Sequence, residues 1–323
     1  MEEQKQLCYK CGVKPPNYKI RSQKVCRDCF IKNTEHLFRS NLKALLSPKK
    51  GENLLIAISG GANSMSMLHL TDTCKNPEKT TKLMQFTPVL LYIDDSFIYH
   101  TPQSQVSEFL ESVEKRYNVH INVIKIEEKI PDIEEQLNLP SQAKSDMLYF
   151  VINNLITDFA RENNYQKVIT GESASRVSTL VMSEICKGRG VSVSSFSSPI
   201  LLVDGITIAR PLRELLEKEV AIYHSIYDVP LLTKLPMAQS LTLPWAGSMD
   251  ILIQDFLGNL QSKFPSTTHT LLRTATKLIP QGNFNEICAI CKHTKDGPIN
   301  HLEKFNSEYE DICYACHHLR QNK

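Results

Sequence analysis

The chain has 323 residues, of which 41% are hydrophobic, so it can form one large domain with attachments or about two domains. Its 37 Lys and Arg residues nearly balance its 35 Asp and Glu residues, and the net charge of +2 excludes no class of partner. The chain opens without the apolar stretch of a secretion signal, and no run reaches the roughly 18 apolar residues that span a bilayer. We therefore expect a soluble, cytoplasmic protein with no membrane contact, in which regularly spaced cysteines indicate metal ligands or redox catalysts rather than disulfides.

Two Cys-x-x-Cys pairs mark the first 50 residues. Cys8 and Cys11 form one pair, and Cys26 and Cys29 form the other after fourteen intervening residues. A tight turn lets each pair direct two thiolates at one ion, and two pairs that close a loop of about 15–20 residues are typical of a zinc ribbon. Twelve Lys or Arg residues against four acidic ones in this segment favour contact with nucleic acid. We predict a basic zinc ribbon and linker over residues 1–50.

The stretch from residue 51 to residue 232 alternates apolar runs with helical patterns. The expected strands are 54–58, 86–93, 120–126, 167–170 and 206–209. The expected helices are 64–74, 103–117, 145–163, 175–187 and 213–227. Continuous apolar strands separated by helices are typical of a parallel sheet covered on both faces, so we predict an α/β domain with a doubly wound parallel sheet. Two further stretches, 190–199 and 237–249, are expected to be loops.

The first expected strand runs directly into the sequence Ser59-Gly-Gly-Ala-Asn-Ser64. The chain has only 12 glycines, and Gly60 and Gly61 are the single adjacent pair. A strand followed by such a turn and a helix points backbone N–H groups at an anion, and the missing Cβ atoms let a phosphate approach. The alternative is an ordinary tight turn between a strand and a helix.

The last third of the chain predicts a small helical annex and a second metal site. Helical patterns cover 248–264 and 267–279, and we place the annex over residues 233–284. A second zinc ribbon with four thiolate ligands is predicted over 285–323, and these ligands are Cys288, Cys291, Cys313 and Cys316. Three histidines lie close enough to replace a thiolate: His293, His317 and His318.

Thiol redox chemistry is the alternative for the four cysteine pairs. It requires a pair at a helix N-terminus after a strand, and none of the four follows an apolar run of strand type. Cys74 and Cys186 stand outside the pairs, and we expect both to be small buried side chains.

The loop Ser59-Gly-Gly-Ala-Asn-Ser64 resembles the Ser-Gly-Gly-x-x-Ser PP-loop of the N-type ATP pyrophosphatases, which binds the pyrophosphate of ATP. With the basic ribbon, Tyr92-Ile-Asp-Asp95 and Arg210-Pro-Leu-Arg-Glu-Leu-Leu-Glu-Lys-Glu-Val220, nearly the whole chain is similar to the cytoplasmic tRNA 2-thiolation proteins. The resemblance implies sulfur transfer to C2 of the wobble uridine (mcm5s2U) in tRNA for Lys, Glu and Gln. It implies a thiocarboxylated ubiquitin-related modifier as the sulfur source. It also implies a nucleotide site formed by Ser59, Gly60, Gly61, Ser64 and Asp94.

The chain departs from the catalytic proteins of this group at the residues that carry the chemistry. Ala62 and Asn63 stand where the catalytic loop has Lys and Asp, which removes a charge partner for phosphate and a metal contact. No cysteine occurs in 141–148 or 233–237, where the catalytic proteins carry thiols, and 170–176 replaces their Thr-Gly-His-x-x-Asp-Asp segment.

Two other segments, Gly171-Glu-Ser173 and Lys187-Gly-Arg-Gly190, are similar to the non-catalytic family, cytoplasmic tRNA 2-thiolation protein 2. The resemblance thus implies a heterodimer partner of the catalytic PP-loop paralogue within a tRNA sulfurtransferase complex. Such a partner has no catalytic cysteines of its own, and whether it binds ATP stays open.

Eight basic residues are the candidate tRNA contacts: Lys19, Arg21, Lys24, Arg27, Arg39, Lys187, Arg189 and Arg210. Arg213 is a further candidate, although with Glu217 it could form an ordinary i,i+4 helix pair. Asp94 and Asp95 lie where α/β folds bind ligands, or they cap the next helix. Two other functions stay open: a self-sufficient ATP-dependent adenylating sulfurtransferase, and a zinc-ribbon RNA-binding scaffold whose α/β body is only structural.

Overall fold

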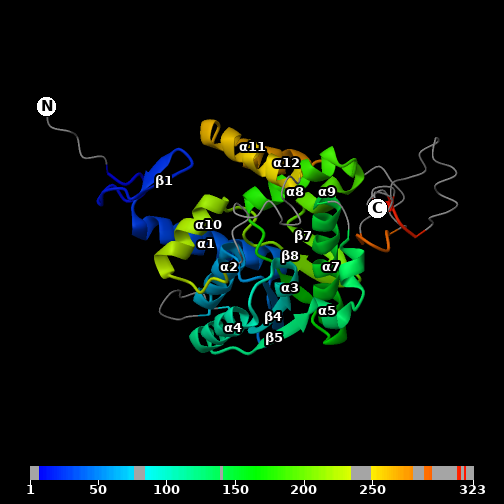
Figure 1. Ribbon diagram of the computed structural model, residues 1–323. Helices are drawn as coiled ribbons and strands as arrows, with labels where there is room; N and C mark the ends of the chain where they lie inside the picture. Colours follow the sequence, from blue (N-terminus) through cyan, green and yellow to red (C-terminus); the bar gives the residue numbers. More distant parts are fainter. Residues whose placement is uncertain are drawn as a thin grey trace.

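A six-stranded sheet forms the centre of the computed structural model, which describes residues 7–75, 84–138, 141–233, 249–278, 287–292, 311–313 and 316–317. In chain order the strands are β3 (Asn53–Ile58), β4 (Thr87–Asp94), β5 (Ile121–Lys125), β6 (Lys167–Ile169), β7 (Ile200–Val203) and β8 (Ile206–Ala209). Their spatial order is β5-β4-β3-β6-β8-β7, and the sheet is parallel from β5 to β8. The edge strand β7 pairs with β8 in the antiparallel sense. Figure 1 shows this sheet enclosed by helices, so the predicted doubly wound α/β fold is confirmed, with one antiparallel edge strand added.

The composition of β3 explains why both faces of the sheet are covered. Leu54, Ile56 and Ile58 are buried in one apolar cluster, and Leu55 is buried in another. Successive side chains of a strand point to opposite faces, so a continuous apolar run needs a layer of helices on each side. The first layer contains α1 (Arg27–Leu46), α2 (Ala62–Thr73), α4 (Gln103–Tyr117) and α10 (Glu217–Tyr227). The second contains α3 (Ser96–Tyr99), α5 (Ile126–Lys129), α6 (Ile133–Gln136) and α7 (Ser141–Glu162).

A third apolar cluster lies beyond the sheet, at the top of Figure 1. Its helices are α8 (Ala174–Cys186), α9 (Val193–Ser197) and α12 (Thr267–Ala275), together with part of α7. Helix α11 (Met249–Lys263) packs against α8 beside it. Val177 and Val181 of α8 are fully buried there, and Leu272 of α12 is buried with them. The four cysteines of the C-terminal pairs belong to the same cluster, so the annex and this metal site share one core.

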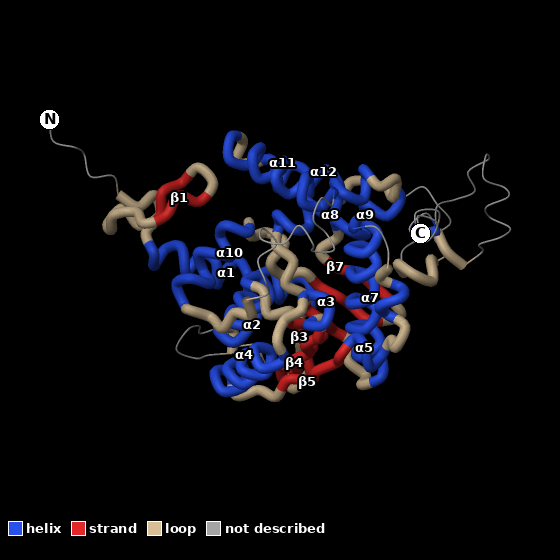
Figure 2. Tube along the Cα trace, in the orientation of Figure 1, coloured by secondary structure: helices blue, strands red, loops and turns tan. Residues whose placement is uncertain are grey.

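The N-terminal hairpin of β1 (Tyr18–Ile20) and β2 (Gln23–Val25) stands away from the sheet, at the left of Figure 2. Helix α1 begins directly after it, and Phe38 and Leu42 of this helix are fully buried in the cluster that covers the first face of β3. We expected a linker in this part of the chain, and the structure instead shows a 20-residue helix that contributes to the core. The domain boundaries expected from the sequence stay predictions.

Three local expectations were wrong. Residues 190–199 are not a loop: a 3-10 turn (Gly190–Ser192) and α9 form there, because Val193 and Phe196 are buried against α8. Helix α10 begins at Glu217 rather than at residue 213. At this start the Glu219 carboxylate accepts a hydrogen bond from the Leu216 N–H at 2.7 Å. Strand β7 was not expected. The loop expected over 237–249 lies outside the described residues apart from Met249, which begins α11.

None of the helices in the described part of the chain combines the length and hydropathy that a bilayer-spanning segment requires.

Candidate functional site

The loop that follows β3 lies where the strand order of the sheet reverses. β4 pairs with one edge of β3 and β6 with the other, and α/β sheets bind ligands in the crevice at such a point. Gly60 has a φ of +77°, which favours glycine, and α2 begins two residues later. The Ser64 hydroxyl accepts a hydrogen bond from the Ser59 N–H at 3.1 Å and donates one to the Gly61 carbonyl at 3.0 Å. The hydroxyl of Ser64 therefore holds the loop in shape.

Two glycines of the site are required by contacts within the chain. A Cβ on Gly60 would lie 2.6 Å from Leu232 Cβ, and the Leu232 N–H donates a hydrogen bond to the Gly60 carbonyl at 3.0 Å. A Cβ on Gly171, after β6, would lie 2.7 Å from Ser64 Cα. We expected the missing Cβ at Gly60 to make room for a phosphate, but Leu232 of the chain itself lies in that room.

A cavity of about 520 Å³ opens beside the loop. Ser59, Gly61 and Ser64 line it. These are three of the five residues that we assigned to a nucleotide, and the assignment stays a prediction. Gly60 does not line the cavity, because it faces Leu232. Apolar side chains form much of the remaining wall: Ile58, Ile93, Ile152 and Ile156.

The charges at this cavity are mostly negative. Three carboxylates line it, those of Asp95, Glu172 and Glu217, and among the described lining residues Arg176 is the one cation. Ala62 brings no charge, and the Asn63 amide donates a hydrogen bond to the Ser173 hydroxyl at 3.3 Å. A triphosphate carries several negative charges and binds best where cations face it, so these walls are poorly suited to it.

Glu172 is held in the ionised state by its neighbours. Burial raises the pKa of this carboxyl, but the Arg210 guanidinium beside it and the Thr170 hydroxyl, which donates at 3.1 Å, lower the pKa below its usual range. Arg210 is only 2% exposed, and it also donates to the Phe196 carbonyl at 2.7 Å. The Tyr149 hydroxyl donates to the other oxygen of Glu172 at 3.3 Å.

Asp94 has a different place from the one we expected. It is buried, and its carboxylate accepts hydrogen bonds from the Ser96 N–H at 2.9 Å and from the Gln103 amide at 3.2 Å. It therefore stabilises the turn into α3 and does not line the cavity, where Asp95 lies instead. Glu172 and Arg176 were missed as site residues, although they follow β6 at the same edge of the sheet and could have been found by that rule.

The cysteines converge in two groups of four. Cys8, Cys11, Cys26 and Cys29 form one, and Cys288, Cys291, Cys313 and Cys316 form the other; in each group all four Sγ atoms lie within 4.8 Å of one another. Thiolates bound tetrahedrally at about 2.3 Å from an ion lie about 3.8 Å apart. The measured Sγ separations of 3.9 Å, for Cys11 with Cys26 and for Cys291 with Cys313, match this edge. Both groups can therefore hold a metal ion.

Backbone N–H groups prepare these thiols to become ligands. The Cys26 N–H donates to Cys8 Sγ at 3.2 Å, and the Cys313 N–H donates to Cys288 Sγ at 3.3 Å. Burial raises the pKa of Cys8, but hydrogen bonds from backbone N–H groups outweigh it and lower the pKa to about 6. The thiolate, which is the form that binds metal, is thereby favoured at neutral pH.

Two details of the cysteine predictions were wrong. Cys26 does lie at the N-terminus of a helix directly after a strand, the geometry that redox pairs use, although the other three sulfurs of its group face it. Cys186 is exposed rather than buried, whereas Cys74 is buried as expected. His317 is buried beside Cys316 but is not part of the four-sulfur group, and His293 and His318 lie outside the described residues.

The structure separates the candidate tRNA contacts into surface and interior residues. The hairpin and the start of α1 expose four of them: Lys19, Arg21, Lys24 and Arg27. Arg39 is half-buried on α1. Arg210 is buried against Glu172, so the expectation that it meets a tRNA phosphate is corrected.

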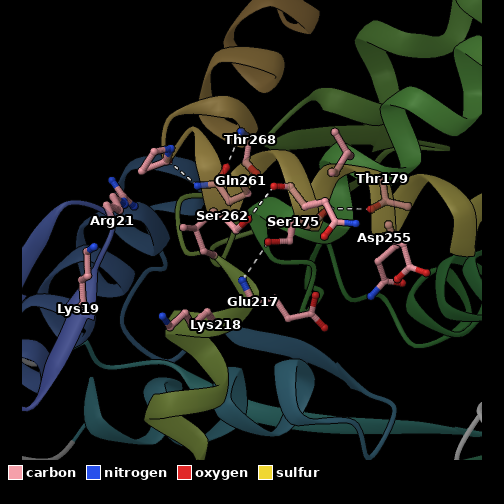
Figure 3. Close-up of a pocket in the computed structure, with 16 residues that line it drawn as sticks. Lys19, Arg21, Ser175, Thr179, Glu217, Lys218, Asp255, Gln261, Ser262 and Thr268 are labelled. Carbon is pink, nitrogen blue, oxygen red and sulfur yellow. Dashed lines mark hydrogen bonds between the residues drawn. The ribbon is translucent and has the colours of Figure 1, made fainter.

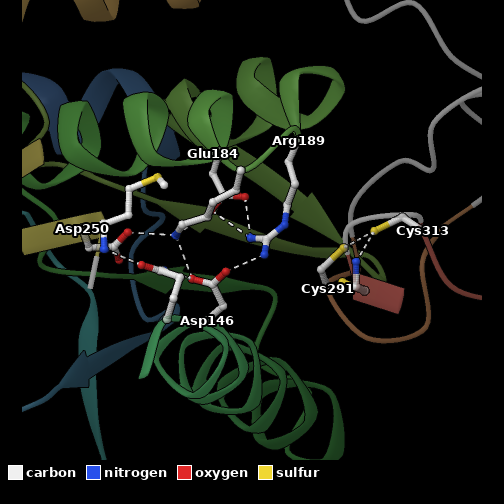
Figure 4. A network of polar contacts seen from close by, with 10 residues as sticks. Asp146, Glu184, Arg189, Asp250, Cys291 and Cys313 are labelled. Carbon is white, nitrogen blue, oxygen red and sulfur yellow. Dashed lines mark hydrogen bonds and ion pairs between the residues drawn. The ribbon is translucent and has the colours of Figure 1, made fainter. Parts of the chain in front are cut away.

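Lys187 and Arg189 are likewise interior, with side chains that are 8% and 4% exposed, and Figure 4 shows Arg189 among their carboxylate partners. Lys187 contacts Asp146 of α7 at 2.7 Å and Asp250 of α11 at 2.8 Å, while Arg189 contacts Glu184 at 2.7 Å and also Asp146. These cations join three helices and are not offered to a ligand at the surface, which corrects that expectation for both.

Arg213 also points inward, and it donates to the Ser197 carbonyl at 2.7 Å. The helix pair with Glu217 does not form, because α10 begins only at Glu217.

Two protein-family models match different parts of the chain. The model of the PP-loop domain family matches residues 34–230. The chain belongs to the PP-loop family. The model named cytoplasmic tRNA 2-thiolation protein 2 matches residues 248–307, which contain α11 and α12.

Relatives of that name confirm the resemblance. Cytoplasmic tRNA 2-thiolation protein 2 of Dictyostelium discoideum is 31% identical over 90% of this chain and 58% of its own length. The protein of that name from Danio rerio is 29% identical, over 84% of this chain and 67% of its own. The one from Schizosaccharomyces pombe is 23% identical, over 96% and 91%. The chain thus spans less than two thirds of the length of the Dictyostelium relative.

Among solved structures, the U34-tRNA thiolase NcsA from Methanococcus maripaludis, which carries a [4Fe-4S] cluster, is similar with a TM-score of 0.70. The identity is 15%, and the similarity covers 94% of this chain and 97% of that one. At this identity the likeness shows that the fold is shared.

Proposed function

We propose that the chain acts in tRNA 2-thiolation as a non-catalytic, tRNA-binding subunit located in the cytoplasm. Its partner is the catalytic PP-loop paralogue, and the product is the 2-thiolated wobble uridine (mcm5s2U) of tRNA for Lys, Glu and Gln. Sulfur reaches the tRNA from a thiocarboxylated ubiquitin-related modifier through the complex. The names of the relatives and the match over residues 248–307 support the tRNA 2-thiolation role.

The chemistry of the PP-loop cavity carries the non-catalytic part of this proposal. Activation of a carbonyl by ATP needs cations that stabilise the departing pyrophosphate, and sulfur transfer needs a thiolate or a cluster. The described walls of the cavity bring three carboxylates, one guanidinium and no cysteine. The paralogue therefore supplies both activation and sulfur transfer, and this chain supplies binding surface.

Zinc is the ion that we assign to both cysteine groups. Four thiolates at tetrahedral spacing, without an open position, are the donor set of structural zinc sites.

Reconstitution tests the division of labour. The chain, the paralogue and the pair are each incubated with tRNA, ATP and the sulfur donor, and 2-thiouridine is quantified by mass spectrometry of the digested tRNA. We expect product from the pair and none from this chain alone. The pair should also tolerate Ala62→Trp in this chain, which fills part of the cavity. Thiolation by this chain alone at the rate of the pair would overturn the proposal in favour of a self-sufficient sulfurtransferase.

A further inference from the structure

A groove of about 680 Å³ lies between the N-terminal hairpin and the annex helices (Figure 3). Lys19 and Arg21 of the hairpin form one end of it, together with Lys218 from the first turn of α10. On the opposite wall α11 presents Gln254 and Asn259, both exposed. The groove therefore joins two parts of the sequence that no single motif connects, the basic ribbon and the annex.

The groove and the PP-loop cavity share a wall. Glu217 lines both, and its backbone N–H donates a hydrogen bond to the Ser175 hydroxyl at 3.1 Å (Figure 3). Ser175 lines the groove, whereas the next residue, Arg176, lines the cavity. The first turns of α8 and α10 thus lie between the two spaces.

The groove has a directional distribution of charge. Lys19 and Lys218 are exposed, and Arg21 is fixed nearby because its guanidinium donates to the Glu214 carbonyl at 2.9 Å. Two carboxylates, those of Glu217 and Asp255, also line the groove. The cations gather at the hairpin end, while the wall formed by α11 offers amides and hydroxyls.

This combination of groups suits a single strand of RNA. Lysines bind phosphate oxygens, and side-chain amides hydrogen-bond base edges and ribose hydroxyls. The volume lies in the range of clefts that hold small organic ligands, so it accommodates a short stretch of unpaired nucleotides rather than a duplex.

We propose that this groove holds an unpaired stretch of the tRNA. Its phosphates lie at Lys19 and Lys218, and its bases or riboses contact Gln254 and Asn259. The inference rests on the proposed function, because it gives the tRNA-binding role a place on the molecule.

Binding of fluorescently labelled tRNA to the full chain tests the cation end. The double variant Lys19→Glu/Lys218→Glu should weaken binding by at least about tenfold, since it replaces two phosphate partners with repelling charges. The control is Lys115→Glu, at an exposed lysine on α4, which should bind as the wild type does. Figure 1 shows α4 at the bottom of the molecule, whereas α11 and α12 lie at the top. With Lys19→Ala/Lys218→Ala, the slope of log affinity against log salt should fall by about two.

A photo-crosslinking residue at Asn259 tests the amide wall. We expect a crosslink to an unpaired loop of the tRNA, and none from the same residue at position 115. The proposal is overturned if the Lys19→Glu/Lys218→Glu variant binds tRNA as tightly as the control, or if the crosslink is confined to a base-paired stem. It is also overturned if the variants keep their affinity for tRNA but no longer bind the paralogue, which would assign the groove to a protein partner. If the wild-type chain binds no tRNA at all, the tRNA-binding function itself fails, which is a different outcome from a groove that is not used.

Discussion

At the scale of single residues, the site depends on close backbone contact between Gly171 and Ser64. Gly171 lies against Ser64 so closely that a Cβ would be 2.7 Å from Ser64 Cα and 2.8 Å from Ser64 N. Both neighbours are backbone atoms that cannot rotate away. Gly171→Ala should therefore push the first turn of α2 away from the segment that follows β6, and it should destabilise the fold by about 1–3 kcal/mol, as overpacking does.

Urea unfolding followed by circular dichroism measures this cost. Gly190→Ala is the control, because a Cβ there meets nothing within 4 Å, and it should change stability by less than about 0.5 kcal/mol. Equal free energies of unfolding for the two variants would show that the backbone around Ser64 moves aside without loss of stability.

The Glu172 carboxylate gives a second prediction, which concerns how the free energy of unfolding depends on pH. Burial raises its pKa, but Arg210 and Thr170 bring it below the usual value, so the folded pKa is lower than the unfolded one. A depressed pKa stabilises the fold above the unfolded pKa of about 4.3, and this stability is lost as the pH falls through the folded pKa. Glu172→Gln should thus flatten the loss of unfolding free energy below about pH 5, whereas Glu134→Gln, at an exposed position on α6, should leave it unchanged. Parallel pH profiles for all three proteins would contradict the assignment.

At the scale of elements, a buried ion-pair network attaches the annex to the α/β body. Lys187 follows α8 and contacts Asp146 of α7 and Asp250 of α11, and its side chain is only 8% exposed (Figure 4). Lys187→Met would leave three carboxylates with Arg189 as their one cation in the network. Removing one partner of a buried pair costs about 3–5 kcal/mol, and we expect a loss of this size in urea unfolding.

Lys129→Met, at an exposed lysine on α5, should cost almost nothing. If the Lys187 variant unfolds at the same urea concentration as this control, the network does not hold α11 to the body.

The elements also show what the sequence could predict. Apolar runs such as 54–58 are decided by local periodicity, and they appear as strands within one or two residues of the expected bounds. Strand β7 was missed although it had a local signal: residues 200–203 are an apolar run, and the turn Asp204-Gly205 that follows is typical of a hairpin with β8. Helix α9 had no local signal, since its Ser-rich segment is helical only where Val193 and Phe196 pack in the cluster with α8.

The same distinction applies to the site. Spacing alone identified both cysteine groups, because metal ligation is a local demand on sequence. The basic side chains of Lys187, Arg189 and Arg210 were also expected to face tRNA. This was wrong because each has a buried carboxylate partner 38 or more residues away, Asp146 for the first two and Glu172 for Arg210. Burial of a charge is decided by tertiary contacts, which no local pattern contains.

At the scale of the whole molecule, the two metal groups have different positions and should have different effects. The N-terminal group supports a hairpin that contains Lys19 and has little core of its own, whereas the C-terminal group is buried in the cluster of α8 and α12. A two-stranded hairpin is marginal in water, so its order depends on the metal. Cys29→Ser and Cys313→Ser should each lower the zinc content by one ion per chain, measured by mass spectrometry of the metal, and Cys186→Ser should not.

The effect on tRNA then separates the two sites. Cys29→Ser should weaken tRNA binding about as much as loss of the hairpin lysines, because the cations are no longer held at the groove. Cys313→Ser should lower the stability of the annex core and leave the affinity at low temperature nearly intact. Equal loss of affinity in both variants would mean that the C-terminal group contacts the tRNA as well, and an unchanged affinity in Cys29→Ser would remove the ribbon from the binding surface.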